Sequence, residues 1–299
     1  MGSHGASLNG QRVKEFYIFG NGITFSISPV IHNTGFQHDN LPYKYSIRES
    51  PSIDGVADLI NDESFGGASV TMPHKLQAHK FCHKQSDTAK DIGAINTLIV
   101  EGEGKDRTIT GDNTDWSGLC NIVTKYCNRS KRTLNSGLVI GAGGASRAAL
   151  YALHRAGVKK IYMVNRTYAS AESVRDAFAK LFSIEVLPSL QDLPQYPDVI
   201  ISTIPANIYT PDEFKNIFGP GGLCIDMSYK PRRTPLLAAA EARDGWETIK
   251  GVEVLLAQGF DQYRLWTGRD APRQAIVDAV NAHEGAQAAA AKISIEGKL

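Results

Sequence analysis

Four short segments in the first half of the chain carry polar side chains that could do chemistry. They are Ser26-Ile27-Ser28-Pro29, Thr71-Met72-Pro73-His74-Lys75, Gly93-Ala94-Ile95-Asn96-Thr97 and Gly111-Asp112-Asn113-Thr114-Asp115. A lysine can stabilise and protonate a ketone oxygen that receives a hydride, and a neighbouring carboxylate can orient that lysine, so Lys75 and Asp115 are the candidate catalytic pair. Neutral hydrogen-bonding groups suited to a small hydroxylated carboxylic acid accompany this pair: Ser26, Ser28, Thr71 and Asn96.

Each segment taken alone has a plainer explanation. The serines before Pro29 could cap a helix, Asn96 could be a turn residue, and residues 112–115 could form a loop rich in Asp and Asn. The occurrence of all four segments in one chain favours a binding site over four unrelated turns.

Expected strands and helices alternate around these segments, as in an α/β protein with parallel sheets. Apolar runs predict strands over 16–19 and 68–71, and helical spacing predicts helices over 29–37 and 76–81. Pro29 suits the first turn of its helix. Because loops at strand ends bind ligands in open α/β sheets, we expect the polar segments to converge on one site.

The second half of the chain predicts a doubly wound nucleotide-binding sheet. Its strands are expected over 137–140, 160–164, 198–203 and 223–227. The first strand leads directly into a glycine-rich turn, and a helix over 145–156, closed by Gly157, follows the turn.

The glycine-rich turn resembles the GxGxxG fingerprint, with Ser146 at the position of the third glycine. The first glycine permits a tight turn, and the second lets the backbone approach a pyrophosphate at the helix N-terminus. The alternative is an ordinary turn, but the strand before it and the helix and strand after it favour a dinucleotide. The residues expected to bind the cofactor here are Gly141, Ala142, Gly143, Gly144, Ala145 and Thr203.

The end of the second strand indicates which dinucleotide binds. NAD enzymes usually carry an acidic residue there for the ribose 2′-hydroxyl, whereas this strand runs into Asn165, Arg166 and Thr167. Arg166 can grip a 2′-phosphate with its planar guanidinium, so the sequence favours NADP. The alternative is that Arg166 is a solvated surface residue.

Composition excludes several other classes of protein. The formal net charge of +1 and the lack of long charged runs argue against nucleic acid and membrane-surface partners. The sequence contains no apolar run long enough to span a bilayer and no signal-peptide pattern, so we expect a cytoplasmic protein. Its four cysteines lack CxxC spacing, so no metal site or disulfide framework is expected.

The two ends of the sequence differ from the rest. Residues 1–10 are typical of a disordered leader or an expression remnant. The alanine-rich tail after Gly285 is typical of a frayed helix or a second loose end.

We therefore expect two α/β domains with a cleft between them. A catalytic, substrate-binding domain is assigned to residues 13–117 and a Rossmann-type domain to 118–257, with the boundary near 116–119. The helices over 258–285 are expected to return to the first domain.

These motifs, in this order, resemble those of the shikimate dehydrogenase family, which includes quinate/shikimate dehydrogenases and domains of fused multifunctional enzymes. The resemblance extends from about Phe16 to about Val280. It implies that Ser26 and Ser28, in an SxSPxxHN segment completed by His32-Asn33, bind the substrate carboxylate. It also implies that Tyr229 and Gln258 touch substrate.

The family's VTxPxK segment matches Thr71, a substrate residue, and Lys75, the catalytic lysine. Its GAxNT and DNTD segments match Asn96 and Asp115, the partner of the lysine. In the second half the family's NRT segment corresponds to Asn165-Arg166-Thr167. Met227 and Gly251 are implied to lie near the nicotinamide.

Three positions depart from the family pattern. Ser170 replaces a second basic residue that helps many members grip the 2′-phosphate, so dual NAD and NADP use is compatible with the sequence. Trp116 replaces a common glycine, as in fused enzymes. His74 also occurs in quinate-using relatives; it could modify a pKa or select quinate, but we favour a solvated bystander.

The resemblance implies NADPH-dependent, reversible reduction of 3-dehydroshikimate to shikimate in aromatic amino acid biosynthesis, by a monomer or homodimer. The nearest alternative is quinate oxidation with NAD. Two further alternatives keep the fold without the chemistry, namely a metabolite-sensing regulator and a scaffold for protein partners.

Overall fold

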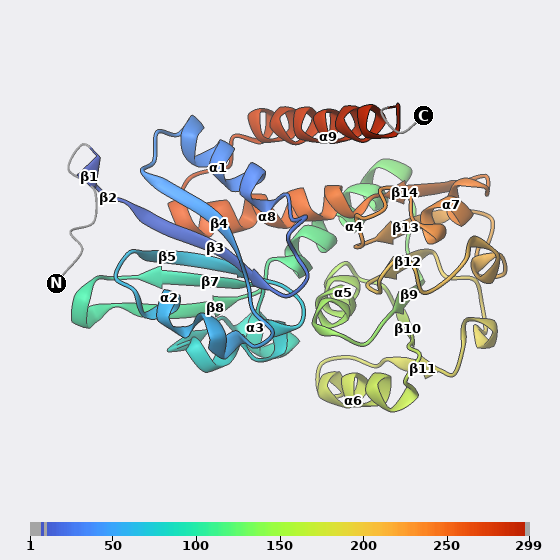
Figure 1. The fold of residues 1–299 in the computed structure, drawn as a ribbon. Coiled ribbons are helices and arrows are strands. Elements are labelled where there is room, and N and C mark those ends of the chain that lie inside the picture. Colours follow the sequence, from blue (N-terminus) through green and yellow to red (C-terminus); the bar gives the residue numbers. More distant parts are fainter. Residues whose placement is uncertain (1–6, 9–10, 297–299) are drawn as a thin grey trace.

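The computed structural model describes residues 7–8 and 11–296, which form two α/β units, each built on a six-stranded sheet (Figure 1). Helices α4 (Asp115–Ser130) and α8 (Gly251–Thr267) pack against each other between the two sheets. The predicted α/β class, with a doubly wound second sheet, is confirmed. The division at residues 117/118 stays a prediction, and it falls inside α4 rather than in a linker.

The first sheet mixes parallel and antiparallel pairs. Its strands lie in the order β4 (Tyr43–Glu49), β3 (Lys14–Gly20), β5 (Phe65–Val70), β7 (Thr97–Glu101), β8 (Thr108–Asp112) and β6 (Lys84–Gln85). β3 runs parallel to β4 and β5, whereas β7 runs antiparallel to β5 and β8. The prediction of parallel sheets is therefore wrong for β7. The short connection between β7 and β8 cannot make a parallel crossover, which needs about a dozen residues.

The helices of the first unit follow the predicted pattern in one place and depart from it in another. They are α1 (Ser28–His38), α2 (Ala57–Asn61) and α3 (Asp87–Ile92). The helix predicted over 29–37 is α1. The helix predicted over 76–81 is wrong, because the chain there forms two 3₁₀ turns, His74–Leu76 and Ala78–Phe81. The Lys75 carbonyl accepts a hydrogen bond from the Ile95 amide at 2.8 Å instead of one from the next helical turn.

The second sheet is parallel throughout. Its strands lie in the order β11 (Glu185–Leu187), β10 (Lys160–Val164), β9 (Ser136–Ile140), β12 (Val199–Ser202), β13 (Gly222–Asp226) and β14 (Trp246–Ile249). The chain starts at the centre with β9, moves outward through β10 and β11, and returns to β12 on the other side. This order creates a crevice between β9 and β12, where doubly wound sheets bind dinucleotides.

The helices of this unit lie on both faces of the sheet (Figure 1). They are α5 (Gly144–Arg155), α6 (Tyr168–Phe178) and α7 (Pro235–Glu241). The central strands of the sheet are fully buried. Leu138 and Val139, adjacent on β9, point to opposite faces, and each is fully buried in a different hydrophobic cluster. Both faces of the sheet therefore contribute to the core that fixes the crevice.

Of the two ends of the described chain, the first departs in part from the prediction and the second agrees with one of the two alternatives given for it. Most of residues 1–10 lie outside the described residues, but β1 (Ser7–Leu8) pairs with β2 (Gln11–Arg12). At the other end, the alanine-rich tail belongs to α9 (Arg273–Glu296), which packs along α1 (Figure 1). The tail is thus a helix rather than a loose end.

Candidate active site

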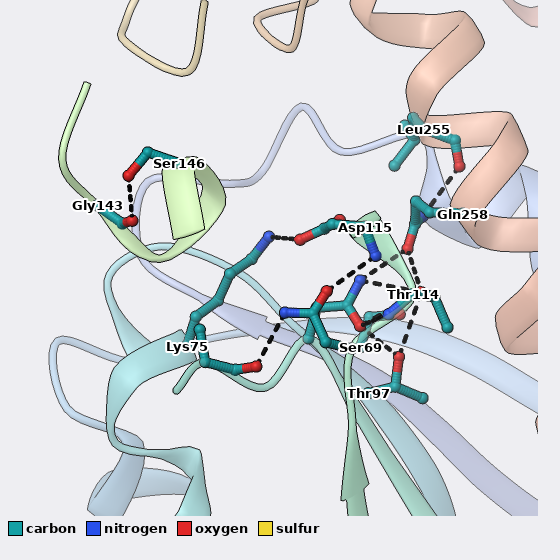
Figure 2. A network of polar contacts seen from close by, with 12 residues as sticks. Ser69, Lys75, Thr97, Thr114, Asp115, Gly143, Ser146, Leu255 and Gln258 are labelled. Atoms are coloured by element: carbon teal, nitrogen blue, oxygen red, sulfur yellow. Dashed lines mark hydrogen bonds and ion pairs between the residues drawn. The ribbon is translucent and has the colours of Figure 1, made fainter. Parts of the chain in front are cut away.

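Lys75 and Asp115 form an ion pair whose two charged atoms, Nζ and Oδ2, lie 2.5 Å apart (Figure 2). Lys75 lies in the 3₁₀ turn that follows β5, and Asp115 is the first residue of α4. Their side chains are 13% and 6% exposed, so the pair is largely shielded from bulk water. The Asp115 carboxylate holds the Lys75 ammonium in one orientation. A fixed orientation of the donor is what proton transfer to a substrate oxygen requires.

The backbone around this pair is held by the neighbouring polar segments. The Asp115 amide donates to Asn113 Oδ1 at 3.0 Å, and Asn113 Nδ2 donates to the Ala94 carbonyl at 2.9 Å. The amide of Ile95, in the same segment as Ala94, donates to the Lys75 carbonyl. The segment at 93–97 therefore braces both members of the pair.

One cavity of about 350 Å³ collects every residue that the sequence assigns to catalysis or substrate binding. These residues are Ser26, Ser28, Thr71, Lys75, Asn96, Asp115, Tyr229 and Gln258. Asn96 precedes β7 rather than ending a strand, but β7 is antiparallel to β5, so its beginning lies beside the end of β5. The convergence is thus a property of the structure, whereas the individual roles stay predictions.

Asn96 is hydrogen-bonded to Thr97, Thr114 and Gln258, which belong to the buried network drawn in Figure 2. Its Oδ1 accepts from the Thr114 amide at 2.7 Å, and its Nδ2 donates to Gln258 Oε1 at 3.1 Å. Because Gln258 belongs to α8, this bond ties the helix between the two sheets to the floor of the cavity. Asn96 is 2% exposed, so a substrate hydroxyl would meet an amide whose orientation is already fixed.

Two serine hydroxyls face each other at another part of the cavity wall. Ser26 Oγ donates to Ser28 Oγ at 3.2 Å. The Tyr229 hydroxyl hydrogen-bonds to Ser26, and burial raises the pKa of Tyr229, so its hydroxyl stays protonated as a donor. Hydroxyl groups placed this way can donate charge-assisted hydrogen bonds to a carboxylate.

A second pocket, of about 270 Å³, lies at the crevice of the second sheet. The predicted cofactor residues that line it are Gly141, Ala142, Gly143, Asn165, Arg166 and Thr203. Gly141 has a φ of +116°, and a β-carbon there would lie 2.3 Å from Thr203 Oγ1, so the turn needs glycine. A β-carbon on Gly143 would meet nothing within 4 Å, which leaves open space at the N-terminus of α5 for an anion.

The charges in this pocket fit a phosphorylated ribose. Among its lining residues in the described chain, Arg166 is the one charged side chain, and none is a carboxylate. Ser170 also lines the pocket, at the position where the family often has a second basic residue. An NADP 2′-phosphate would therefore meet one cation and no repelling acid.

The remaining predicted cofactor residues lie next to the pockets without lining the second one. Gly144 and Ala145 form the first turn of α5, and Thr167 precedes α6. Met227 lines the substrate cavity, and Gly251 packs against the backbone that follows β13: a β-carbon there would lie 2.7 Å from the Met227 carbonyl. The two pockets share Pro205, so a dinucleotide in one would reach the other.

His74 is not solvated, contrary to the prediction. It is 2% exposed, and its Nε2 lies 2.8 Å from the Ser50 carbonyl. The ring therefore anchors the turn that carries Lys75. His74 does not line the cavity.

Several cavity residues were missed, and two of them, Ser69 and Gln262, could have been found from the sequence. Each repeats a predicted residue at the period of its element. Ser69 lies two residues before Thr71 at the end of a strand, and Gln262 lies four residues after Gln258 on a helix. Both residues could have been predicted by moving two positions along the strand from Thr71 and four positions along the helix from Gln258.

Other kinds of site receive no support within the described residues. No group of His, Cys, Asp and Glu there has the arrangement of a metal site, and all four cysteines are free thiols. No helix of the described chain has the length and apolarity needed to cross a membrane.

The fold and the site together define a two-unit dinucleotide-binding protein with a polar cavity beside the nucleotide crevice. Three family models match: the shikimate dehydrogenase substrate binding domain at residues 18–98, shikimate / quinate 5-dehydrogenase at 127–232, and the shikimate 5′-dehydrogenase C-terminal domain at 251–280. The chain belongs to the shikimate dehydrogenase family.

Individual relatives agree with this assignment. The pentafunctional AROM polypeptide of Schizosaccharomyces pombe is 38% identical over 89% of this chain, which corresponds to 18% of that relative. The chain spans 17–18% of the length of such fused relatives. A shikimate 5-dehydrogenase structure from Mycobacterium fortuitum is 30% identical, with a TM-score of 0.74, covering 90% of this chain and 98% of that one. A shikimate dehydrogenase in complex with NADP+ is 26% identical, with a TM-score of 0.74, covering 94% and 99%.

Proposed function

We propose that the protein catalyses the reversible, NADPH-dependent reduction of 3-dehydroshikimate to shikimate. The observation that carries this proposal is the Lys75–Asp115 ion pair, which lines a hydroxyl-rich cavity next to a dinucleotide pocket. A lysine and a carboxylate at this junction suit a reaction in which a proton and a hydride reach the same carbonyl group.

Different cavity residues bind different groups of the substrate. Ser26 and Ser28 donate hydrogen bonds to the carboxylate. The ring hydroxyls and the carbonyl are fixed by the groups near the catalytic pair, namely Thr71, Asn96 and Gln258, with Tyr229 closing the side formed by the second unit.

The bound cofactor supplies the hydride, and the protein handles the proton. During reduction the Lys75 ammonium hydrogen-bonds to the substrate oxygen and gives it a proton as negative charge develops. Asp115 holds the ammonium on that oxygen. In the direction of oxidation Lys75 accepts the proton from the hydroxyl group.

Arg166 grips the 2′-phosphate, which makes NADP the preferred cofactor. The relative solved with NADP+ supports this choice. Ser170 leaves the grip with one cation, so NAD remains usable.

A second candidate function, quinate oxidation with NAD, is favoured by Ser170 alone. A metabolite sensor on the same fold would not need a catalytic pair, and Lys75 and Asp115 are both present and paired. We place the protein in the cytoplasm as a monomer or homodimer, with residues 13–117 as the catalytic domain, 118–257 as the NADP domain, and the helices over 258–285 packed back on the former.

Four assays test the proposal: purified protein with shikimate or quinate, each with NADP+ or NAD+, followed by the absorbance of the reduced nicotinamide. The pair of shikimate and NADP+ should give the highest kcat/KM. A higher kcat/KM for quinate with NAD+ would favour the second candidate, and no turnover with any pair would favour the sensor.

A further inference from the structure

Tyr45 lies behind the two serines, outside the cavity lining. It is on β4 and is 2% exposed. Its hydroxyl donates to Ser69 Oγ at 2.6 Å and also hydrogen-bonds to the Ser28 side chain. Ser28 and Ser69 both line the cavity, so this one buried hydroxyl connects two surfaces that face the substrate.

Gln262 determines which group donates and which accepts in the hydrogen bonds that link it to Ser69 and Ser69 to Tyr45. Gln262 Nε2 donates to the Asn96 carbonyl at 3.2 Å and to Thr97 Oγ1 at 3.0 Å. Its two amide protons are thereby used, so Oε1 must face Ser69, whose hydroxyl donates to it at 2.9 Å. Since the Ser69 proton points to Gln262, Ser69 Oγ is free to accept, and the Tyr45 proton points to Ser69.

Two residues of the first sequence motif hold Tyr45 in place, and the proposed function does not use them. The His32 ring stacks on the Tyr45 ring with centroids 4.6 Å apart. Asn33 clamps the Tyr45 backbone with two hydrogen bonds, from Asn33 Nδ2 to the Tyr45 carbonyl at 2.9 Å and from the Tyr45 amide to Asn33 Oδ1 at 2.8 Å. The position of the tyrosine hydroxyl is therefore determined from both ring and backbone.

The serine next to this hydroxyl has only one proton to donate. With the Tyr45 proton directed at Ser69, the hydrogen bond between Ser28 and Tyr45 has to use the Ser28 proton, which is then not available to a ligand. A bound carboxylate requires the Ser28 proton to turn toward it. Rotation of the Tyr45 hydroxyl from Ser69 to Ser28 satisfies Ser28, and a substrate hydroxyl can then donate to Ser69 in place of Tyr45.

We propose that Tyr45 is a positioning residue for the substrate carboxylate: its hydroxyl turns from Ser69 to Ser28 on binding, so that Ser28 can donate to the carboxylate. The choice of shikimate as ligand rests on the proposed function. Tyr45 thereby extends the carboxylate site by one buried residue that does not line the cavity.

The test compares Tyr45→Phe with the wild-type enzyme, using shikimate and methyl shikimate, whose ester lacks the negative charge. Kd is measured by calorimetry and KM and kcat by absorbance. Tyr43→Phe is the matched control, since it removes a hydroxyl from the same strand but outside this chain of hydrogen bonds. Thermal denaturation checks that each variant is folded.

For Tyr45→Phe we expect the Kd and KM for shikimate to rise about tenfold, with kcat changed by less than about twofold. The Kd for methyl shikimate should change by less than about twofold, because a neutral ester depends less on the serine donors. Tyr43→Phe should leave all four constants unchanged.

An equal loss of affinity for acid and ester would overturn the proposal, because it would mean that Tyr45 only supports packing. Unchanged shikimate affinity would overturn it too. If the wild-type protein binds shikimate without turning it over, the proposed function fails while the acid–ester comparison still decides the role of Tyr45. If the protein does not bind shikimate, both fail.

Discussion

The first residue of α5, Gly144, lies directly against the side chain of Lys75. A β-carbon at position 144 would come 2.9 Å from the Lys75 β-carbon, closer than two such atoms can pack. The glycine-rich turn of the second unit therefore limits where the side chain of Lys75, in the first unit, can lie. Binding of the dinucleotide and orientation of the lysine share one backbone segment.

Gly144→Ala should therefore lower kcat more than it changes cofactor binding. The added methyl group does not fit beside the Lys75 β-carbon, so Lys75 has to shift relative to Asp115, and we expect a loss in kcat of about tenfold, or about 1.4 kcal/mol of barrier. Gly143→Ala is the comparison, because its methyl group would enter the open space in front of the helix and should mainly raise the KM for NADP+. Identical kinetic effects of the two variants would refute this division of roles.

Arg166→Asp should change the cofactor preference toward NAD. The carboxylate would repel the 2′-phosphate and could bind the ribose hydroxyls instead, so kcat/KM for NADP+ should fall about 100-fold while that for NAD+ holds or rises. Lys180→Asp makes the same change of charge at an exposed position outside the pocket. An unchanged ratio between the two cofactors in Arg166→Asp would remove Arg166 from the phosphate site.

Ser170→Arg should have the opposite effect. Ser170 lines the nucleotide pocket together with Arg166, so an arginine there would add a second cation to the 2′-phosphate site. We expect the KM for NADP+ to fall about threefold to tenfold, with little change for NAD+. Fluorescence titration of NADPH into the folded variant measures the effect without turnover, and equal changes for NADH would contradict it.

His32 should make the protein less stable in acid. Burial lowers the pKa of His32 from 6.5 to about 3, so the folded state leaves the ring neutral where the unfolded state takes up a proton. Its contribution to the free energy of unfolding is therefore complete above about pH 6.5 and is lost as the pH falls toward about 3.

Urea denaturation at a series of pH values measures this contribution. His32→Gln should flatten the fall in the free energy of unfolding between about pH 6 and pH 4 by up to about 1.4 kcal/mol per pH unit. His79→Gln, at an exposed histidine, is the control. The same slope in His32→Gln and wild type would show that His32 is not the group responsible.

The sequence predicts best those features that depend on local spacing. The strand Lys160–Val164 has the predicted bounds. The predicted tight turn is present at Gly141, whose positive φ favours glycine. The convergence of the segments that follow β3, β5 and β8 was predicted from the rule that ligands bind at strand ends, whereas Asn96 joins them because β7 is antiparallel to β5.

The features that escaped prediction depend on contacts between distant segments. Nothing near Leu76 reveals that the Lys75 carbonyl bonds to Ile95 and prevents a regular helix. The antiparallel direction of β7 depends on its pairing with β5, 27 or more residues earlier in the chain. Likewise, the burial of His74 requires the Ser50 carbonyl, which comes from the segment after β4.

The central claim is that Lys75 handles the proton and does not merely bind substrate. Its most direct test measures kcat and the Kd for shikimate in Lys75→Ala, with Lys80→Ala, at an exposed lysine in the next 3₁₀ turn, as the control. We predict that kcat falls by about 10²–10⁴ while the Kd for shikimate changes by less than about threefold. A loss of affinity as large as the loss of turnover would contradict the account.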